Sequence, residues 1–170
     1  MKNTIKLFVL AILLLSFAVS TFAQVSATAT ATATIVTPIA IANAANMNFG
    51  NVAVSAVGGT VILTPAGTRS TTGGVTLPAV IGTVTAASFT VTGLTGSTYT
   101  IAITGAPLTV TSGSNTMTVT AFTSNPTPTG LLAGLGTQTL TVGATLNVAA
   151  AQAAGTYLSG TPFTVTVNYN

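Results

Sequence analysis

The chain has 170 residues, of which 48% are hydrophobic and 2% are charged, with three Lys or Arg and no Asp, Glu, His or Cys. This composition excludes disulfide bonds and leaves none of the carboxylate, imidazole or thiolate ligands on which most protein metal sites depend. It also provides too few cations to bind a nucleic acid and no side chain that acts as a general base near neutral pH, so we expect no enzymatic activity and no cofactor.

The first 23 residues have the pattern of a secretory signal peptide. Lys2 and Lys6 flank the start of an apolar run that is too short to span a bilayer comfortably, and the sequence TFA, ending at Ala23, offers a cleavage position. We therefore expect export to the periplasm, the cell surface or the extracellular medium. No later apolar run is long enough for a membrane helix, so we expect no transmembrane segment after signal removal. Arg69 is then the one charged side chain of residues 24–170.

Residues 24–38 form an extension in which Ala and Thr alternate before Pro38. Read as a strand, it places the predicted subunit contacts on one face: Ala27, Ala29, Ala31, Ala33 and Ile35. Burying four Ala methyl groups contributes at most about 3 kcal/mol, whereas fixing eight backbone residues costs on the order of 1 kcal/mol each. The extension is thus expected to be ordered only where its backbone pairs with another strand. It is either the first strand of its own domain or a mobile arm that adds to a free edge of a neighbouring molecule.

Residues 39–170 are expected to form a single all-β domain, because about a quarter of residues 24–170 are Thr and almost none are helix-surface residues such as Glu, Lys or Gln. Short runs of alternating apolar and hydroxyl residues, separated by Gly, Pro, Ser and Asn, predict antiparallel strands with one buried face. In chain order, the predicted strands cover residues 39–49, 47–57, 59–65, 75–82, 87–93 and 98–105, with a loop over 66–74. Two sheets packed face to face are the expected arrangement.

The C-terminal half contains the clearest hairpin. Leu108 and Val110 are predicted to pair with Met117 and Val119 across a four-residue loop. A proline-rich loop over 124–130 should follow, then a pair of strands over 137–143 and 144–150. The last predicted strand, 161–170, alternates aromatic and Val residues on one face and ends with a penultimate Tyr169.

Arg69 is the residue most suited to a specific polar contact. Its Gly- and Thr-rich surroundings indicate a loop, where its guanidinium would bind nearby backbone carbonyls. The alternative is a contact with a partner's carbonyls or with a sugar, and we keep Arg69 as a candidate partner or ligand contact.

Five sequence stretches identify the chain as similar to a family of small exported bacterial proteins, the domain of unknown function DUF4402. They are MNFGNV, GTRSTTGGV, FTVTGLTGSTYTI, LTVGATLNVAAAQAAGTY and FTVTVNYN, and the resemblance covers about Ile39 to Asn170. More loosely, the early NFG and the penultimate Tyr169 resemble the pilin and spore-coat-U type adhesin sandwiches. That resemblance implies an immunoglobulin-like sandwich whose subunits join by a donated N-terminal strand.

These observations favour a non-enzymatic exported structural protein, a subunit of a fimbria-like surface fibre, coat or extracellular matrix. With one charge in residues 24–170, copies of the chain repel each other little, so self-association is expected. Other surface or envelope proteins are further candidate partners, and nucleic acid is not. The alternative is a monomeric surface adhesin or carbohydrate-binding module that uses the loops around Arg69.

Overall fold

The computed structural model describes residues 3, 5 and 24–170, so the predicted signal peptide and its cleavage site lie outside the described residues. The chain divides into two units, Met1–Ile35 and Val36–Asn170. In the first unit, residues 24–35 belong to no helix or strand, and every one of them is exposed. Over the described residues, we find no helix with the length and hydrophobicity that crossing a membrane requires.

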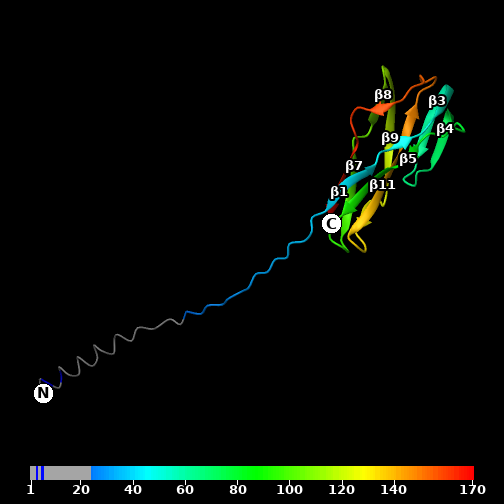
Figure 1. Ribbon diagram of the computed structural model, residues 1–170. Helices are drawn as coiled ribbons and strands as arrows, with labels where there is room; N and C mark the ends of the chain where they lie inside the picture. The colour runs from blue at the N-terminus through cyan, green and yellow to red at the C-terminus, as the bar shows by residue number, and fades with distance from the viewer. Residues whose placement is uncertain (1–2, 4, 6–23) are drawn as a thin grey trace. The chain divides into compact units, whose positions relative to one another are not determined.

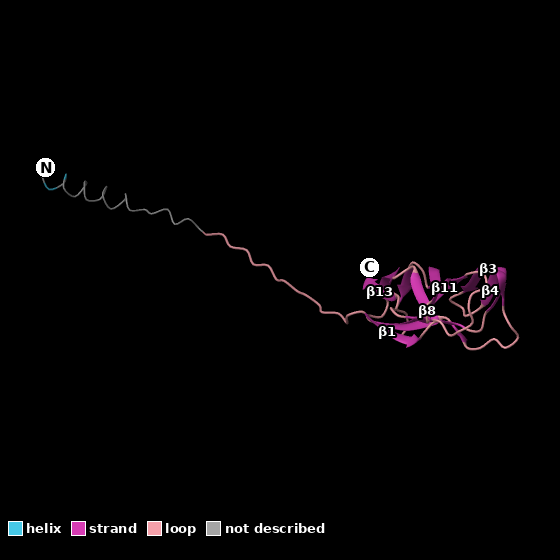
Figure 2. Ribbon diagram, turned by 90° about the horizontal axis from the view of Figure 1, so that it is seen from above, coloured by secondary structure: helices cyan, strands magenta, loops and turns pink. Residues whose placement is uncertain are grey.

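The second unit consists of antiparallel β-strands, and residues 24–170 contain no helix (Figures 1 and 2). The strands in its first half are β1 (Ala40–Ala45), β2 (Asn48–Phe49), β3 (Ala53–Leu63), β4 (Arg69–Thr76), β5 (Val84–Thr85) and β6 (Ala87–Thr92). Those in its second half are β7 (Thr98–Thr104), β8 (Leu108–Ser112), β9 (Asn115–Asn125), β10 (Thr129–Leu131), β11 (Thr137–Val148), β12 (Leu158–Ser159) and β13 (Thr164–Tyr169). The predicted all-β antiparallel sandwich is confirmed.

The long strand β11 organises the larger sheet. One edge of β11 pairs with β9, and the other edge pairs first with β6, through Thr137–Val142, and then with β3, through Ala144–Val148. The sheet continues from β6 to β1, from β3 to β4, and from β9 to β8 and β12. A three-stranded sheet of order β10-β7-β13 and a pair of short strands, β2 and β5, complete the unit.

The three-stranded sheet covers only one half of the larger sheet, which we call the covered half. There, alternate side chains of both sheets interlock in one apolar cluster, as expected for face-to-face sheets. β6 and β11 contribute Ala87, Val91, Leu140 and Val142, and the smaller sheet contributes Tyr99, Val165 and Val167.

The other half, which we call the open half, consists of β4, β3, the second part of β11, the first part of β9, β8 and β12. Its buried cluster comes only from strands of the larger sheet: Val61, Val75, Leu108, Val119, Ala144, Leu146 and Val148. No strand of the three-stranded sheet contributes to this cluster. Segment 47–54 and Phe163 pack against it as partly buried apolar residues. One apolar face of the open half therefore lacks a covering sheet.

Two predictions about turns were wrong. The expected strand pair over 137–150 is the single strand β11. Gly143, which suggested a turn, instead allows the backbone of Leu63–Pro65 to approach closely, because a side chain there would collide with it. In the hairpin of β8 and β9, Leu108 pairs with Val119 and Val110 with Met117 as predicted, but Ser112 also pairs with Asn115, so the loop has two residues and not four.

The region around Arg69 also differs from the prediction. The expected loop over 66–74 is largely strand β4, which pairs with β3 from Leu63↔Arg69 to Ala53↔Thr76. Glycines on both strands permit this pairing, since a side chain on Gly59 or Gly73 would meet the opposite backbone, and Gly73 has a φ of +64°. The expected strand over 75–82 is not formed beyond Thr76. Its apolar residues Leu77, Val80 and Ile81 are exposed.

Candidate functional site

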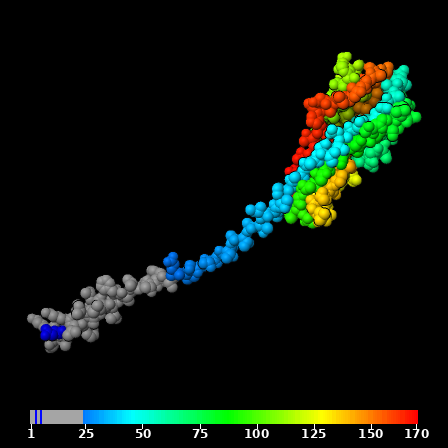
Figure 3. Space-filling view, viewed as in Figure 1, coloured from blue at the N-terminus to red at the C-terminus, as the bar shows by residue number. Residues whose placement is uncertain are grey.

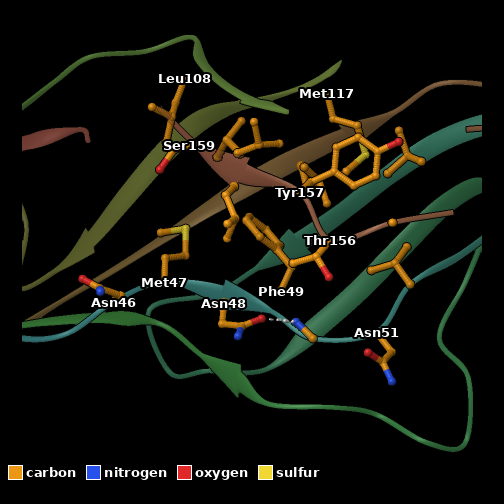
Figure 4. Close-up of a pocket in the computed structure, with 18 of the residues that line it drawn as sticks. Asn46, Met47, Asn48, Phe49, Asn51, Leu108, Met117, Thr156, Tyr157 and Ser159 are labelled. Carbon is orange, nitrogen blue, oxygen red and sulfur yellow. Dashed lines mark hydrogen bonds between the residues drawn. The ribbon is translucent and has the colours of Figure 1, made fainter. Parts of the chain in front are cut away.

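The uncovered face of the open half is an open groove with a volume of about 1400 Å³. Its floor is apolar and comes from β8, β9 and β11, with Leu108, Val110, Met117, Val119, Leu146 and Val148. Residues 46–54 form one wall, and residues 152–159 with Phe163 form the other. Figure 4 shows Met47 and Phe49 projecting from the first wall, with Tyr157 beside Met117 across from them.

A short polar corner fixes the first wall. The side-chain oxygen of Asn48 accepts a hydrogen bond of 2.8 Å from the backbone amide of Gly50. The backbone amide of Asn51 donates a hydrogen bond of 2.8 Å to the carbonyl of Ile81. Gly50 has a φ of +68°, which favours Gly, and a side chain at this position would collide with the carbonyl of Ile81. The corner therefore holds Phe49 with its ring in the groove.

Arg69 supports the same corner from β4. One guanidinium nitrogen donates hydrogen bonds to the carbonyl of Phe49 and, at 2.9 Å, to the carbonyl of Asn51. Its interpretation as a residue that binds backbone carbonyls is confirmed, although it lies in a strand and not in a loop. The side chain is only partly buried and does not line the groove. A contact between Arg69 and a partner or ligand stays a prediction.

The second wall is held by Tyr157. Its hydroxyl donates to the carbonyl of Ala153 at 2.7 Å and lies 2.8 Å from the side-chain nitrogen of Gln152. Gln152 also donates to the carbonyl of Thr116 on β9 at 3.3 Å. These bonds fold residues 152–157 back over the end of the hairpin formed by β8 and β9.

Phe163 closes the groove where the two halves meet. Its ring lies 4.8 Å from that of Phe122 in a tilted arrangement and 6.3 Å from that of Phe89 in an edge-on arrangement. It packs against both apolar clusters. The groove is therefore a continuation of the sandwich core that is open to solvent.

The groove can bind apolar and hydrogen-bonding groups, but it offers little chemistry. None of its lining residues is charged, and Tyr157 is its one titratable side chain. Amides and hydroxyls lie along its border, including Asn43, Asn46, Thr156 and Ser159. An arrangement of this kind recognises shape and backbone groups, not charge.

Two strands with a free edge, β1 and β13, lie at one end of the groove. Within residues 24–170, β1 pairs only with β6, and β13 pairs only with β7. The groove begins beside both strands, because Asn43 of β1 and Phe163, next to β13, are among its lining residues. The two strands are neighbours, and Figure 3 shows the cyan residues of β1 near the red residues of the C-terminal segment.

The predicted subunit contacts lie in residues 24–35, in the first unit. Ala27, Ala29, Ala31 and Ala33 are exposed, and Ile35 is 98% exposed. Residues 24–39 contain no strand. Pairing of this segment with its own domain or with a neighbouring molecule stays a prediction. Its role in subunit contact stays a prediction.

Sequence reasoning missed the groove itself. Met47, Phe49 and Phe163 lie in predicted strands, and Tyr157 lies in the connection before the last one. One feature of the sequence could have pointed to the groove: all four residues lie within the stretches that carry the family resemblance. Four of those stretches contribute lining residues, and the fifth contributes Arg69.

The fold and the site define an antiparallel β-sandwich with one half uncovered. Residues 39–169 match the family described as "Domain of unknown function (DUF4402)", and the chain belongs to this family, as its motifs indicated. No match was found among curated proteins or among solved structures.

Proposed function

We propose that this chain is a non-enzymatic, exported structural protein that forms a surface fibre, coat or extracellular matrix by joining copies through β-strand edges. The observation that supports this most is the open half, whose apolar face continues the core without a covering sheet. Segment 47–54 and Phe163 bury four of its six floor residues, Leu108, Val119, Leu146 and Val148, but leave the groove open between its walls. An apolar groove with polar residues along its border is the kind of surface at which proteins interact. The free edges of β1 and β13 beside it offer unpaired backbone groups to another strand.

The composition supports the same function. The sequence has no Asp, Glu, His or Cys, so the groove cannot supply an acid, a base or a thiolate for catalysis. The apparent signal peptide over residues 1–23 supports export. A structural role requires only apolar contact and backbone pairing, which this fold provides.

Deleting residues 24–34 tests the proposal. We expect the chain without these residues to stay folded by circular dichroism but to lose the large species that the intact chain forms in sedimentation velocity and negative-stain images. A matched control keeps the length and composition of the segment but groups its Ala and Thr into blocks. It should also lose assembly, because it no longer has an apolar face. Monodisperse monomers of the intact chain at high concentration would contradict the proposal.

A second candidate is a monomeric adhesin or carbohydrate-binding module. Tyr157 and the amides of Asn46 and Asn51 at the groove favour it, since aromatic rings and amides together suit sugars. Retention of the chain by a glycan array, and loss of that retention in the Tyr157→Ala variant, would support this function over the structural one.

A further inference from the structure

We propose that two glycine-containing turns at one end of the second unit, residues 93–97 and 131–136, insert their exposed leucines into the groove of a second copy of this chain. We call these two turns the leucine tip. The inference rests on the proposed function, because it takes self-association as its starting point. It names two surfaces that meet through side chains, with no strand added to a sheet.

The leucine tip exposes apolar side chains that the core does not use. Leu135 is 94% exposed, Leu131 is 47% exposed and Leu94 is 38% exposed, whereas Leu132 is fully buried in the cluster of the covered half. A single exposed leucine is common on protein surfaces, but here three occur within two neighbouring turns. Leu132 anchors the tip to the core, and the other three leucines gain stability only when another surface covers them.

Hydrogen bonds between the two turns fix the backbone of the tip. The amide of Gly93 donates to the carbonyl of Gly136 at 2.9 Å, and the amide of Gly96 donates to the carbonyl of Leu132 at 2.7 Å. The amide of Leu132 donates in turn to the carbonyl of Ser97 at 2.9 Å. A side chain on Gly136 would collide with the carbonyl of Gly93, so this close approach requires glycine. Because the turns are already ordered, little conformational entropy is lost when the leucines bind.

The groove is a hollow apolar surface that suits such a tip. Pockets for small ligands usually measure about 300–1,000 Å³, and the groove exceeds that range at about 1400 Å³. It presents Met47 and Met117, whose flexible side chains adapt to the shape of an apolar partner. Neither the tip nor the lining of the groove contains a charged side chain, so the contact buries no charge.

Strand β11 separates the tip from the groove of the same chain. It begins at Thr137, directly after the tip, and its other end carries the floor residues Leu146 and Val148. Its 12 residues span about 40 Å. Figure 1 shows the C-terminus, which lies beside the tip, at one end of the unit, and β3 and β4 at the other end. The tip can therefore enter only the groove of another copy.

Two different surfaces at opposite ends of a unit produce a head-to-tail contact. Such a contact leaves one tip and one groove free on every pair, so further copies can add until a rotation closes a ring. Repeated addition of this kind produces a fibre, which is the form of assembly that the proposed function requires.

A second exposed apolar loop is less suited to this role. In residues 77–83, Val80 is 75% exposed and Ile81 is 56% exposed. Asn51, in the first wall of the groove, binds this loop through its backbone amide to the carbonyl of Ile81 and through its side chain to the carbonyl of Val80 at 3.0 Å. This loop and the groove thus lie at the same end of the unit. Reciprocal contact between two copies there would close a dimer and would not extend a fibre.

Disulfide trapping tests the proposal, because the chain has no native Cys. One preparation carries Leu135→Cys, and a second, isotope-labelled preparation carries Met117→Cys on the groove floor. The two are mixed under mild oxidation, and mass spectrometry counts the linked pairs that contain one copy of each. We expect several-fold more of these pairs from Leu135→Cys than from the matched control Val80→Cys. Val110→Cys repeats the test from β8 in case Met117→Cys disturbs folding.

A second measurement uses no cysteine. Leu135→Ser removes the most exposed leucine of the tip, and we expect self-association in sedimentation velocity to weaken by about tenfold or more. Val80→Ser is the matched control and should leave association nearly unchanged. Both positions are exposed, so circular dichroism should show that both variants fold as the intact chain does.

Preferential linking through Leu135→Cys, together with weaker association of Leu135→Ser, supports the proposal. Equal or preferential linking from Val80→Cys would overturn it, and so would linking within one chain of the Leu135→Cys/Met117→Cys double variant. Binding to phosphatidylcholine vesicles that Leu135→Ser abolishes, without linked copies, would also overturn it, because the tip would then contact a lipid surface. Normal assemblies of Leu135→Ser would overturn this inference and leave the proposed function standing, whereas an absence of assemblies from the intact chain would reject both.

Discussion

Tyr99 connects the two layers of the covered half. It is fully buried, and its hydroxyl donates to the side-chain oxygen of Gln138 on β11 at 2.8 Å. The same oxygen accepts a hydrogen bond of 2.9 Å from the amide of Leu131 on β10. Gly130 lies directly against the ring, where any side chain would collide with it. One polar group in the core thus fixes the position of β7, β10 and β11 relative to one another.

Tyr99 also predicts a pH dependence. Burial raises the pKa of Tyr99 above its usual value of 10.0, so the folded state keeps the phenol proton after the unfolded state has lost it. The contribution to stability is complete below the unfolded pKa and is lost as the pH rises through the folded pKa. We expect Tyr99→Phe to lower the free energy of unfolding by about 1 kcal/mol near neutral pH, since the hydrogen bond to Gln138 is lost.

Urea denaturation of both proteins across the alkaline range measures this effect. The difference between the wild-type chain and Tyr99→Phe should shrink as the pH rises above 10.0, because only the wild-type chain can ionise at this position. A difference that stays constant to high pH would contradict the assignment.

Arg69 gives a second prediction at this scale. Arg69→Ala removes the hydrogen bonds to the carbonyls of Phe49 and Asn51, and we expect a loss of about 2 kcal/mol in the free energy of unfolding. Arg69→Lys should lose less, because an ammonium group can still reach one carbonyl. Chemical denaturation checks both variants, and an Arg69→Ala chain as stable as the wild type would show that the corner does not depend on the guanidinium.

Among the strands, β11 belongs to both halves of the unit, because it pairs with β6, β3 and β9. Leu140 is fully buried in its first part, opposite Phe89 of β6. Leu140→Ala leaves a cavity in the covered half, and we expect a loss of about 2–5 kcal/mol. Thr139→Ala, on the exposed face of the same strand, is the matched control and should change stability little. Thermal or urea unfolding compares them, and similar losses for both would contradict the assigned faces of β11.

The sequence predicts strand faces well and strand ends poorly. Alternation places Tyr99, Val165 and Val167 on buried faces, since a side-chain period of two depends only on local geometry. Glycine misleads because it has two roles: Gly143 and Gly73 looked like turn residues, yet they lie within strands where another backbone passes close by. Close approach is a tertiary property, and no local pattern encodes it.

The groove could not be predicted for a related reason. Its walls come from residues 46–54, 152–159 and Phe163, which lie far apart in the chain and are brought together by the pairing of β11 with β3 and β9. Each residue by itself resembles a core residue. The alternation in residues 27–34, in contrast, is visible in the sequence without a structure.

The whole molecule gives a prediction about salt. Arg69 is the one charged side chain of residues 24–170, so contacts between copies cannot depend on ion pairs between side chains. We expect the size distribution in sedimentation velocity to stay unchanged from about 20 mM to about 1 M sodium chloride, a range over which charge interactions become screened. Ammonium sulfate should increase association, because it strengthens apolar burial. Dissociation by sodium chloride would contradict an apolar interface.

The bond between Tyr169 and Thr37 has a mechanical consequence. If copies are joined through residues 24–35, tension in a fibre enters each domain at Thr37 and then follows β1. Because β1 is antiparallel to β6, with its ladder bonds perpendicular to the strands, the load would shear those bonds together instead of opening them one after another. The Tyr169 hydroxyl, held between Thr37 and the amide of Leu94, ties the C-terminal strand to the same point. The applied force would thus enter the domain at the point where β1 and β13 are held together.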